Sequence, residues 1–167
     1  MEKATLTFRF AVKEDISLIL TLIKELADYE GMLSEVIATE ELLEEWLFEK
    51  QKAEVLIGEI DGNPISFALF FHNFSTFLGK PGIYLEDLYV LPEMRGKGIG
   101  TSMLSFLAKL ALERKCGRLE WACLDWNKPS IQFYKQLGAT PLEDWTVYRV
   151  QNETLQTLAN KTDAGNS

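Results

Sequence analysis

Residues 95–100 read RGKGIG, a basic residue followed by glycines at alternate positions. The segment follows the apolar run YLEDLYVLP and precedes a stretch with helical periodicity. Glycines let a ligand approach the backbone closely, and the amides at a helix start carry partial positive charge. This combination favours a pyrophosphate ligand, with Arg95 and Lys97 adding charge. The alternative is a tight strand-to-helix turn that binds nothing.

Two commoner phosphate-binding motifs do not fit this segment. A Rossmann fingerprint, G-x-G-x-x-G, would need a glycine where Thr101 stands, and it opens the first strand–helix unit of a domain. A P-loop needs G-x-x-x-x-G-K-[ST], which the sequence lacks. The motif present is R-x-x-G-x-G, formed by Arg95, Gly98 and Gly100.

Composition and charge narrow the partners. The chain has 167 residues, enough for one domain with a sizeable core, and 47% of them are hydrophobic. Its net charge of −8 argues against nucleic acid and suits a cationic substrate, the alternative being plain solubility. His72 is the single histidine, and Cys116 and Cys123 lack metal-ligand spacing, so we expect no metal. No apolar run approaches about 20 residues, so we expect no signal peptide, no membrane span and a cytoplasmic protein with reduced thiols.

Hydrophobic periodicity predicts alternating strands and helices, with Asp15 capping the first helix. Strands are expected at residues 5–11, 54–60, 65–73, 83–90, 118–126 and 145–150, and helices at residues 16–27, 39–48, 98–115 and 128–138. This order predicts an α/β (α+β) fold, a mixed sheet with helices on both faces. We expect a single domain over residues 1–167, with its core in about 5–150 and a disordered polar tail at 160–167.

Two signatures carry a family resemblance. LYVLPEMRGKGIGTSML, residues 88–104, resembles the acetyl-CoA-binding segment of the GNAT superfamily of N-acetyltransferases, and LDWNKPSIQFYKQLGA, residues 124–139, is similar to its second signature. LIKELADYE, YLEDLYV and DWNKPSIQFYK, in that order, resemble the spermidine/spermine (diamine) acetyltransferase group, including its thialysine-acetylating sister branch. The resemblance implies the GNAT fold, with a mostly antiparallel sheet splayed at the acetyl-CoA strand. It also implies a homodimer.

The resemblance further implies how acetyl-CoA binds. The pyrophosphate would contact Arg95, Gly96, Lys97, Gly98, Ile99, Gly100 and Thr101. The pantetheine arm would hydrogen-bond the backbone of Leu88, Tyr89 and Val90. The second signature would complete the cofactor site with Asn127, Lys128, Pro129 and Ser130. Asn127 matches an asparagine that contacts the same arm, the alternative being an Asx turn before Pro129.

In the resembled group, acetyl passes directly from the CoA thioester to a primary amine. An alkylamine with a pKa near about 10.4 must first lose a proton, which costs roughly 4–5 kcal/mol at pH 7. Glu86 matches the position that accepts this proton through water, and Tyr134 matches the tyrosine that protonates the CoA sulfur. The alternatives are a solvated strand carboxylate for Glu86 and a core aromatic beside Phe133 for Tyr134. Asp87 is expected on the opposite face of the strand, unless a bulge intervenes.

The amine acceptor needs a negative, partly apolar pocket. The resemblance assigns it Tyr29, Glu30, Glu86, Glu120, Trp121 and Ala122. Polyamine-acetylating members carry an acid in the loop before YLED, whereas residues 74–82 here read FSTFLGKPG. This departure resembles the thialysine branch and favours a short diamine or lysine-like amino acid over a long polyamine. Two alternative functions are a protein or peptide N-acetyltransferase and a non-catalytic acyl-CoA-binding module.

Overall fold

The computed structural model describes residues 4–162 and separates the chain into two compact units. The first unit ends at Ala122 and the second begins at Cys123. Across the described residues, no helix combines the length and apolar character needed to cross a membrane. The single domain over residues 1–167 stays a prediction.

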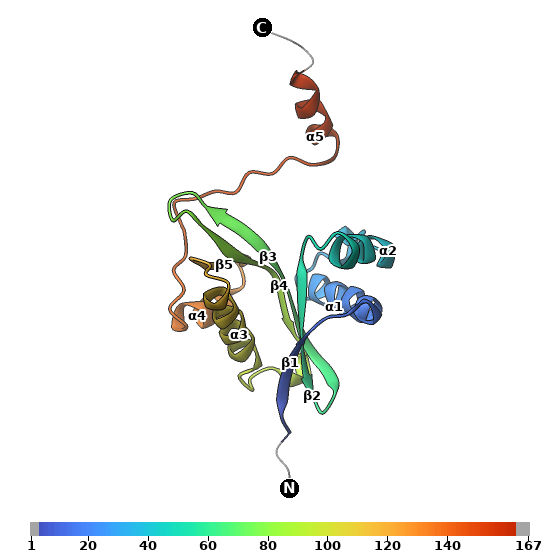
Figure 1. Cartoon of the computed structure of the whole chain (residues 1–167), viewed down its shortest axis with the longest axis vertical. Helices are drawn as coiled ribbons and strands as arrows, with labels where there is room; N and C mark the ends of the chain where they lie inside the picture. Colours follow the sequence, from blue (N-terminus) through green and yellow to red (C-terminus); the bar gives the residue numbers. More distant parts are fainter. Residues whose placement is uncertain (1–3, 163–167) are drawn as a thin grey trace. The chain divides into compact units, whose positions relative to one another are not determined.

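A five-stranded sheet forms the centre of the first unit (Figure 1). Its neighbouring strands follow the chain order: β1 (Leu6–Phe10), β2 (Glu54–Ile60), β3 (Asn63–Ser75), β4 (Lys80–Val90) and β5 (Leu119–Trp121). Strands β1 to β4 are antiparallel, and β5 runs parallel to β4. The predicted mixed, mostly antiparallel sheet is therefore confirmed, although β5 is shorter than the predicted strand over residues 118–126.

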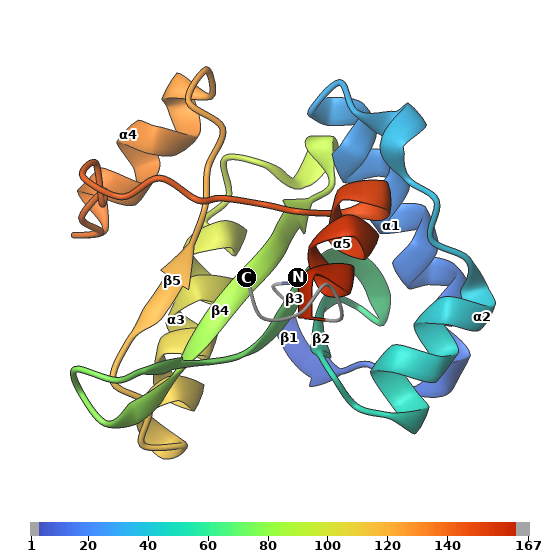
Figure 2. The same ribbon diagram turned by 90° about the horizontal axis from the view of Figure 1, so that it is seen from above.

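Helices cover both faces of this sheet, as predicted (Figure 2). α1 (Ile16–Tyr29) and α2 (Glu40–Leu43) lie on one face, and α3 (Ile99–Glu113) lies on the other. The chain continues α2 as a π-helical segment over Glu44–Glu49. Because both faces are covered, the central strands carry nearly continuous apolar runs.

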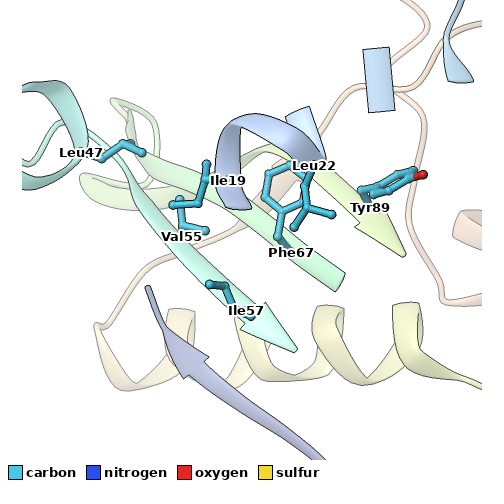
Figure 3. Packing of buried hydrophobic residues seen from close by; sticks show 7 residues of the cluster. All are labelled: Ile19, Leu22, Leu47, Val55, Ile57, Phe67 and Tyr89. Carbon is cyan, nitrogen blue, oxygen red and sulfur yellow. The ribbon is translucent and has the colours of Figure 1, made fainter. Parts of the chain in front are cut away.

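The core between α1 and the sheet anchors the end of β4 (Figure 3). It contains seven buried side chains: Ile19, Leu22, Leu47, Val55, Ile57, Phe67 and Tyr89. Phe67 is fully buried. Truncating such a side chain to alanine typically costs about 3–5 kcal/mol. Tyr89 joins this cluster from β4, so core packing holds the predicted pantetheine-binding strand in place.

The loop predicted over residues 74–82 is mostly strand. β3 ends at Ser75 and β4 begins at Lys80, which leaves only a short turn between them. In this turn the Ser75 hydroxyl oxygen accepts a hydrogen bond of 3.1 Å from the Leu78 amide. The Gly79 amide donates to the Ser75 carbonyl at 2.8 Å. Ser75 is consequently buried at the base of the turn.

Asp15 does not cap α1, contrary to the prediction. Its carboxylate accepts two hydrogen bonds from the Arg9 guanidinium, at 2.7 and 2.9 Å, and one of 2.8 Å from the Val12 amide. These bonds stabilise the charged form, and those from Arg9 above all lower the pKa of Asp15 from its ordinary value. Asp15 therefore ties β1 to the start of α1.

In its described residues, 123–162, the second unit contains two α-helices, α4 (Lys128–Gln136) and α5 (Asn152–Ala159). α4 confirms the predicted helix, whereas the sequence pattern does not predict α5. Residues 145–150 form no strand, so that prediction is wrong. A strand needs a neighbour for its amides and carbonyls, and within residues 4–162 no strand pairs with this segment.

The predicted disordered tail over residues 160–167 stays a prediction. Asn160–Thr162 form a short 3-10 turn after α5. Residues 163–167 of that prediction lie outside the described residues.

Candidate active site

The start of α3 has the backbone that glycine adopts most readily. Gly96 and Gly98 have φ angles of 77° and 78°, and Gly98 is the N-cap residue of α3. No side chain in the described chain caps this end, and the first amides of a helix have no intrahelical partner. A Cβ built at either glycine would meet no atom within 4 Å. Uncapped amides beside open space are what an anion-binding helix start requires.

β4 is irregular next to this turn. Leu85 and Asp87 pair with consecutive residues of β3, so Glu86 is the extra residue of a β-bulge. On the other side, the parallel ladder with β5 stops where Leu85 faces Trp121. In the described part of the chain, no strand pairs with residues 86–90 from the β5 side. This open edge of β4 is suited to hydrogen-bond an extended ligand.

Three carboxylates interact at the bulge. Asp87 is partly buried, and its burial raises its pKa to about 6, with the like charges of Glu86 and Glu30 adding to the shift. Glu30 follows the last residue of α1, and burial also raises its pKa. Glu86 is exposed. This acidic cluster of Glu30, Glu86 and Asp87 favours a cation, because a positive charge would relieve the repulsion and replace lost hydration.

Arg95 connects the glycine motif to α1 and β4. Its Nε donates a hydrogen bond of 3.1 Å to the Val90 carbonyl oxygen. Its guanidinium carbon lies 4.9 Å from the ring centroid of Tyr29 and 5.5 Å from that of Tyr89. Both distances are within the range of cation–π attraction. A residue predicted to bind the cofactor therefore contacts one predicted to bind the amine.

The residues at β5 that were predicted to bind the amine lie outside the acidic cluster. Glu120 forms an ion pair with Arg118. Trp121 is the last residue of β5, and Ala122 follows it at the end of the first unit. Because Arg118 offsets its charge, Glu120 contributes less negative potential to an amine pocket than a carboxylate of the acidic cluster.

The second unit carries the rest of the predicted site on α4. Asn127 is its N-cap residue, and the Asn127 Oδ1 accepts a hydrogen bond of 3.4 Å from the Ser130 amide. Lys128 begins the helix and Pro129 lies in its first turn, where the missing amide costs nothing. Asn127 therefore caps α4 locally, and its contact with the pantetheine arm stays a prediction.

Tyr134 lies on the same helix. Its ring centroid is 5.5 Å from that of Phe133, with the rings tilted by 48°. Both side chains are partly buried.

Two features of the site have little signal in the sequence. Asp87 is the most strongly perturbed carboxylate of the acidic cluster, yet a regular strand would turn it away from Glu86. The adjacent acids of YLED are the one signal in the sequence: two neighbouring strand residues point to opposite faces, and only a bulge would bring both carboxylates to the same site. The contact between Arg95 and Tyr29 joins segments far apart in the chain, and no spacing rule reveals it.

Residues 20–139 match the model of the Acetyltransferase (GNAT) family. The chain belongs to the GNAT family. A thialysine N-epsilon-acetyltransferase of Bos taurus is 39% identical over 170 residues, covering 95% of this chain and 99% of the relative. A spermidine/spermine N(1)-acetyltransferase-like protein 1 of Homo sapiens is 32% identical over 162 residues, covering 90% of this chain and 23% of that protein.

Solved structures share the fold of this GNAT chain. An integron cassette protein of V. cholerae has a TM-score of 0.77 at 26% identity, covering 94% of this chain and 99% of the other. A predicted acetyltransferase with acetyl-CoA from Clostridium acetobutylicum has a TM-score of 0.72 at 24% identity, covering 87% and 96%. The predicted GNAT fold is confirmed, and this member of the family is an acyltransferase. GNAT acetyltransferases use acetyl-CoA, which the uncapped amides of α3 and the open edge of β4 fit.

Proposed function

We propose that this GNAT enzyme transfers an acetyl group from acetyl-CoA to the primary amine of a small cationic molecule. The acidic cluster at the start of the open β4 edge carries the proposal. Carboxylates there attract a protonated amine, and the adjacent edge is suited to an extended thioester arm. Glu86 and Asp87 of the cluster lie on the same strand as the open edge, so the two reactants would meet at one place.

The cofactor-binding residues have distinct tasks in this proposal. The amides of residues 95–101, with the side chains of Arg95 and Lys97, would bind the pyrophosphate. The backbone of residues 88–90 would hydrogen-bond the pantetheine arm. Residues 127–130 would contact the arm from the second unit. Acetyl-CoA supplies the acyl group in activated form, as a thioester.

The proton transfers are assigned to two residues. Glu86 is exposed at the bulge and would accept the proton of the ammonium group through water. Before this transfer, Asp87 and Glu30 would stabilise the positive charge of the bound ammonium group. The neutral amine then forms the new N–C bond as the C–S bond breaks, and its nitrogen releases a second proton to solvent, which replaces the proton that Tyr134 gives up. Tyr134 would donate a proton to the departing sulfur. General acid or base catalysis of this kind typically contributes about 10²–10⁴-fold.

For the acceptor, we propose a lysine-like amino acid or a short diamine. The β3–β4 turn carries no acid to pair with the distal ammonium groups of a long polyamine. The similarity to a thialysine N-epsilon-acetyltransferase over nearly the whole chain supports the same choice.

A panel of acceptors tests this proposal. Release of the CoA thiol would be measured with thialysine, lysine, ornithine, a short diamine, spermidine, spermine and a lysine-containing peptide. We expect the highest kcat/KM with an amino acid or the short diamine. A preference for the peptide would instead identify a protein acetyltransferase, and binding of CoA without turnover of any amine would identify a binding module.

Glu86→Gln tests the proton acceptor. The variant should lose turnover but regain part of it at high pH, where the neutral amine is more abundant. A loss that is equal at every pH would exclude deprotonation of the amine as the task of Glu86.

We further propose a homodimer of about 38 kDa, twice the 19.0 kDa of one chain, because two-fold dimers are the commonest soluble oligomers. Light scattering at micromolar concentration checks this mass. The cytoplasmic location stays a prediction.

A further inference from the structure

The side chains around Arg95 form a network between the two binding regions of the proposed site. Its members are Glu25 and Tyr29 of α1, Tyr89 of β4 and Arg95 of the glycine motif. All four belong to the first unit. Glu25 and Tyr29 are four residues apart on α1, so they lie on the same side of the helix. The network therefore joins one side of α1 to the turn before α3.

Tyr89 anchors this network in the core. Its side chain is only 6% exposed and packs in the cluster between α1 and the sheet. Burial raises the pKa of the Tyr89 hydroxyl, and the charge of Glu25, to which the hydroxyl is hydrogen-bonded, adds to this shift. Packing and the hydrogen bond together fix the ring of Tyr89. Arg95 therefore has a fixed aromatic surface on the side of β4, 5.5 Å from its guanidinium carbon.

Tyr29 offers Arg95 a second ring, from α1. The guanidinium carbon lies 4.9 Å from the centroid of this ring, and the Nε donates a hydrogen bond to the Val90 carbonyl oxygen. Within residues 4–162, the two terminal nitrogens of Arg95 form no hydrogen bond. A guanidinium stacks through its face and donates through its edge, so ring contacts and phosphate binding are compatible. The rings thus orient Arg95 without using the donors that a pyrophosphate needs.

Orientation matters because Arg95 is exposed. A long side chain in solvent has many rotamers, and a ligand that binds it must restrict them at a cost in affinity. Contacts that already hold the guanidinium reduce this cost. One of these contacts comes from β4, which also carries the proposed pantetheine-binding edge, and the other comes from the last residue of α1. The contact with α1 is the one that reaches the acidic cluster.

We propose that Tyr29 is a positioning residue of the cofactor site, whose ring holds the Arg95 guanidinium for the CoA pyrophosphate and transmits CoA binding to the end of α1. Glu30 of the acidic cluster directly follows Tyr29. A pyrophosphate that fixes Arg95 would also fix Tyr29 and so place Glu30 for the amine. Coupling between two sites is reciprocal, so a bound amine would in turn raise the affinity for CoA. The inference rests on the proposed function for the identity of the anion and the cation.

The affinity for CoA, measured by calorimetry on the full chain without any amine, tests the ring contact. Tyr29→Leu removes the ring and should weaken CoA binding about 2–5-fold, the effect of one exposed cation–π contact. Tyr29→Phe keeps the ring and should retain the wild-type affinity. Trp46→Leu is the matched control: it removes a similarly exposed ring, whose centroid lies 4.4 Å from the Lys50 Nζ, and should leave CoA binding unchanged.

A double-mutant cycle separates this positioning role from a loss of packing. Arg95→Met removes the cation and keeps an unbranched side chain of similar reach. In that background Tyr29→Leu should have no further effect on the affinity for CoA. An equal loss with and without Arg95, or wild-type affinity of Tyr29→Leu, would overturn the proposal.

Hydrogen exchange tests the transmission to α1. The amides of Glu30, Gly31 and Met32 donate to carbonyls in the last turns of α1, at 3.0, 3.0 and 2.8 Å. Binding of CoA should slow their exchange about 2–5-fold in the wild type and in Tyr29→Phe, but not in Tyr29→Leu. Equal slowing in all three proteins, or none in the wild type, would overturn the proposal. A protein that binds CoA but acetylates no amine would leave these readouts unchanged, so failure of the acetyl-transfer proposal is seen separately, in turnover.

Discussion

Asp87→Asn should raise the free energy of unfolding of the protein. It should also lower the kcat/KM of the enzyme. Burial, together with the charges of Glu86 and Glu30, raises the pKa of Asp87 from 3.8 to about 6. Because the pKa is raised in the folded state, ionisation opposes folding. The cost is absent well below pH 3.8, grows between pH 3.8 and about 6, and is constant above. This shift corresponds to about 3 kcal/mol at pH 7.5 and about 1 kcal/mol at pH 4.5, as orders of magnitude.

Calorimetric unfolding at these two pH values measures the difference. The gain in stability from Asp87→Asn should be about 2 kcal/mol larger at pH 7.5, or about 4–8 °C in Tm for a chain of this size. Asp28→Asn is the matched control: Asp28 is exposed near the end of α1, and its replacement should stay within about 0.5 kcal/mol at both pH values. An equal gain for Asp87→Asn at pH 4.5 and 7.5 would refute the reasoning.

Further predictions concern the cofactor, the proton donor and the fold. Gly98→Ala should weaken acetyl-CoA binding in calorimetry, whereas Gly79→Ala, at a similar left-handed φ and also facing open space, should not; an equal loss in both would contradict the site. Tyr134→Phe should lower kcat about 10²–10⁴-fold at unchanged acetyl-CoA affinity, and wild-type turnover would make it a packing residue. Asp15→Ala should cost roughly 1–3 kcal/mol at pH 7, because it leaves Arg9 paired with Glu59 alone and removes the acceptor of the Val12 amide. Because the pKa of Asp15 is lowered, this contribution exists above pH 3.8 and is lost as the pH falls through the lower folded value. Urea unfolding midpoints of the wild type and the variant that stay apart in acid would argue against it.

Asp15 and residues 145–150 show why some sequence predictions are wrong. Aspartate before an apolar helix is typical of a cap, but Arg9 on the neighbouring strand offers two charge-assisted hydrogen bonds, which are stronger than a cap. The composition of residues 145–150 favours a strand, but the segment forms neither strand nor helix. A strand also needs a neighbour, which no property of these six residues can supply.

The sequence by itself determined the family, the alternation of the elements and the two contiguous motifs. The turn before α3 and the start of α4 depend on glycines, Asn127 and Pro129 acting on backbone a few residues away, so spacing along the chain is enough to predict them.

Only the tertiary structure decided how the acidic residues behave. A bulge leaves Glu86 without a partner residue in the register with β3. The end of α1 places Glu30 close enough for its charge to raise the pKa of Asp87. A pKa depends on burial and on nearby charge, and both are properties of packing between segments distant in the chain. The contact of Arg95 with Tyr29 has the same origin, because the core that holds α1 against β4 determines which side chains meet at its edge.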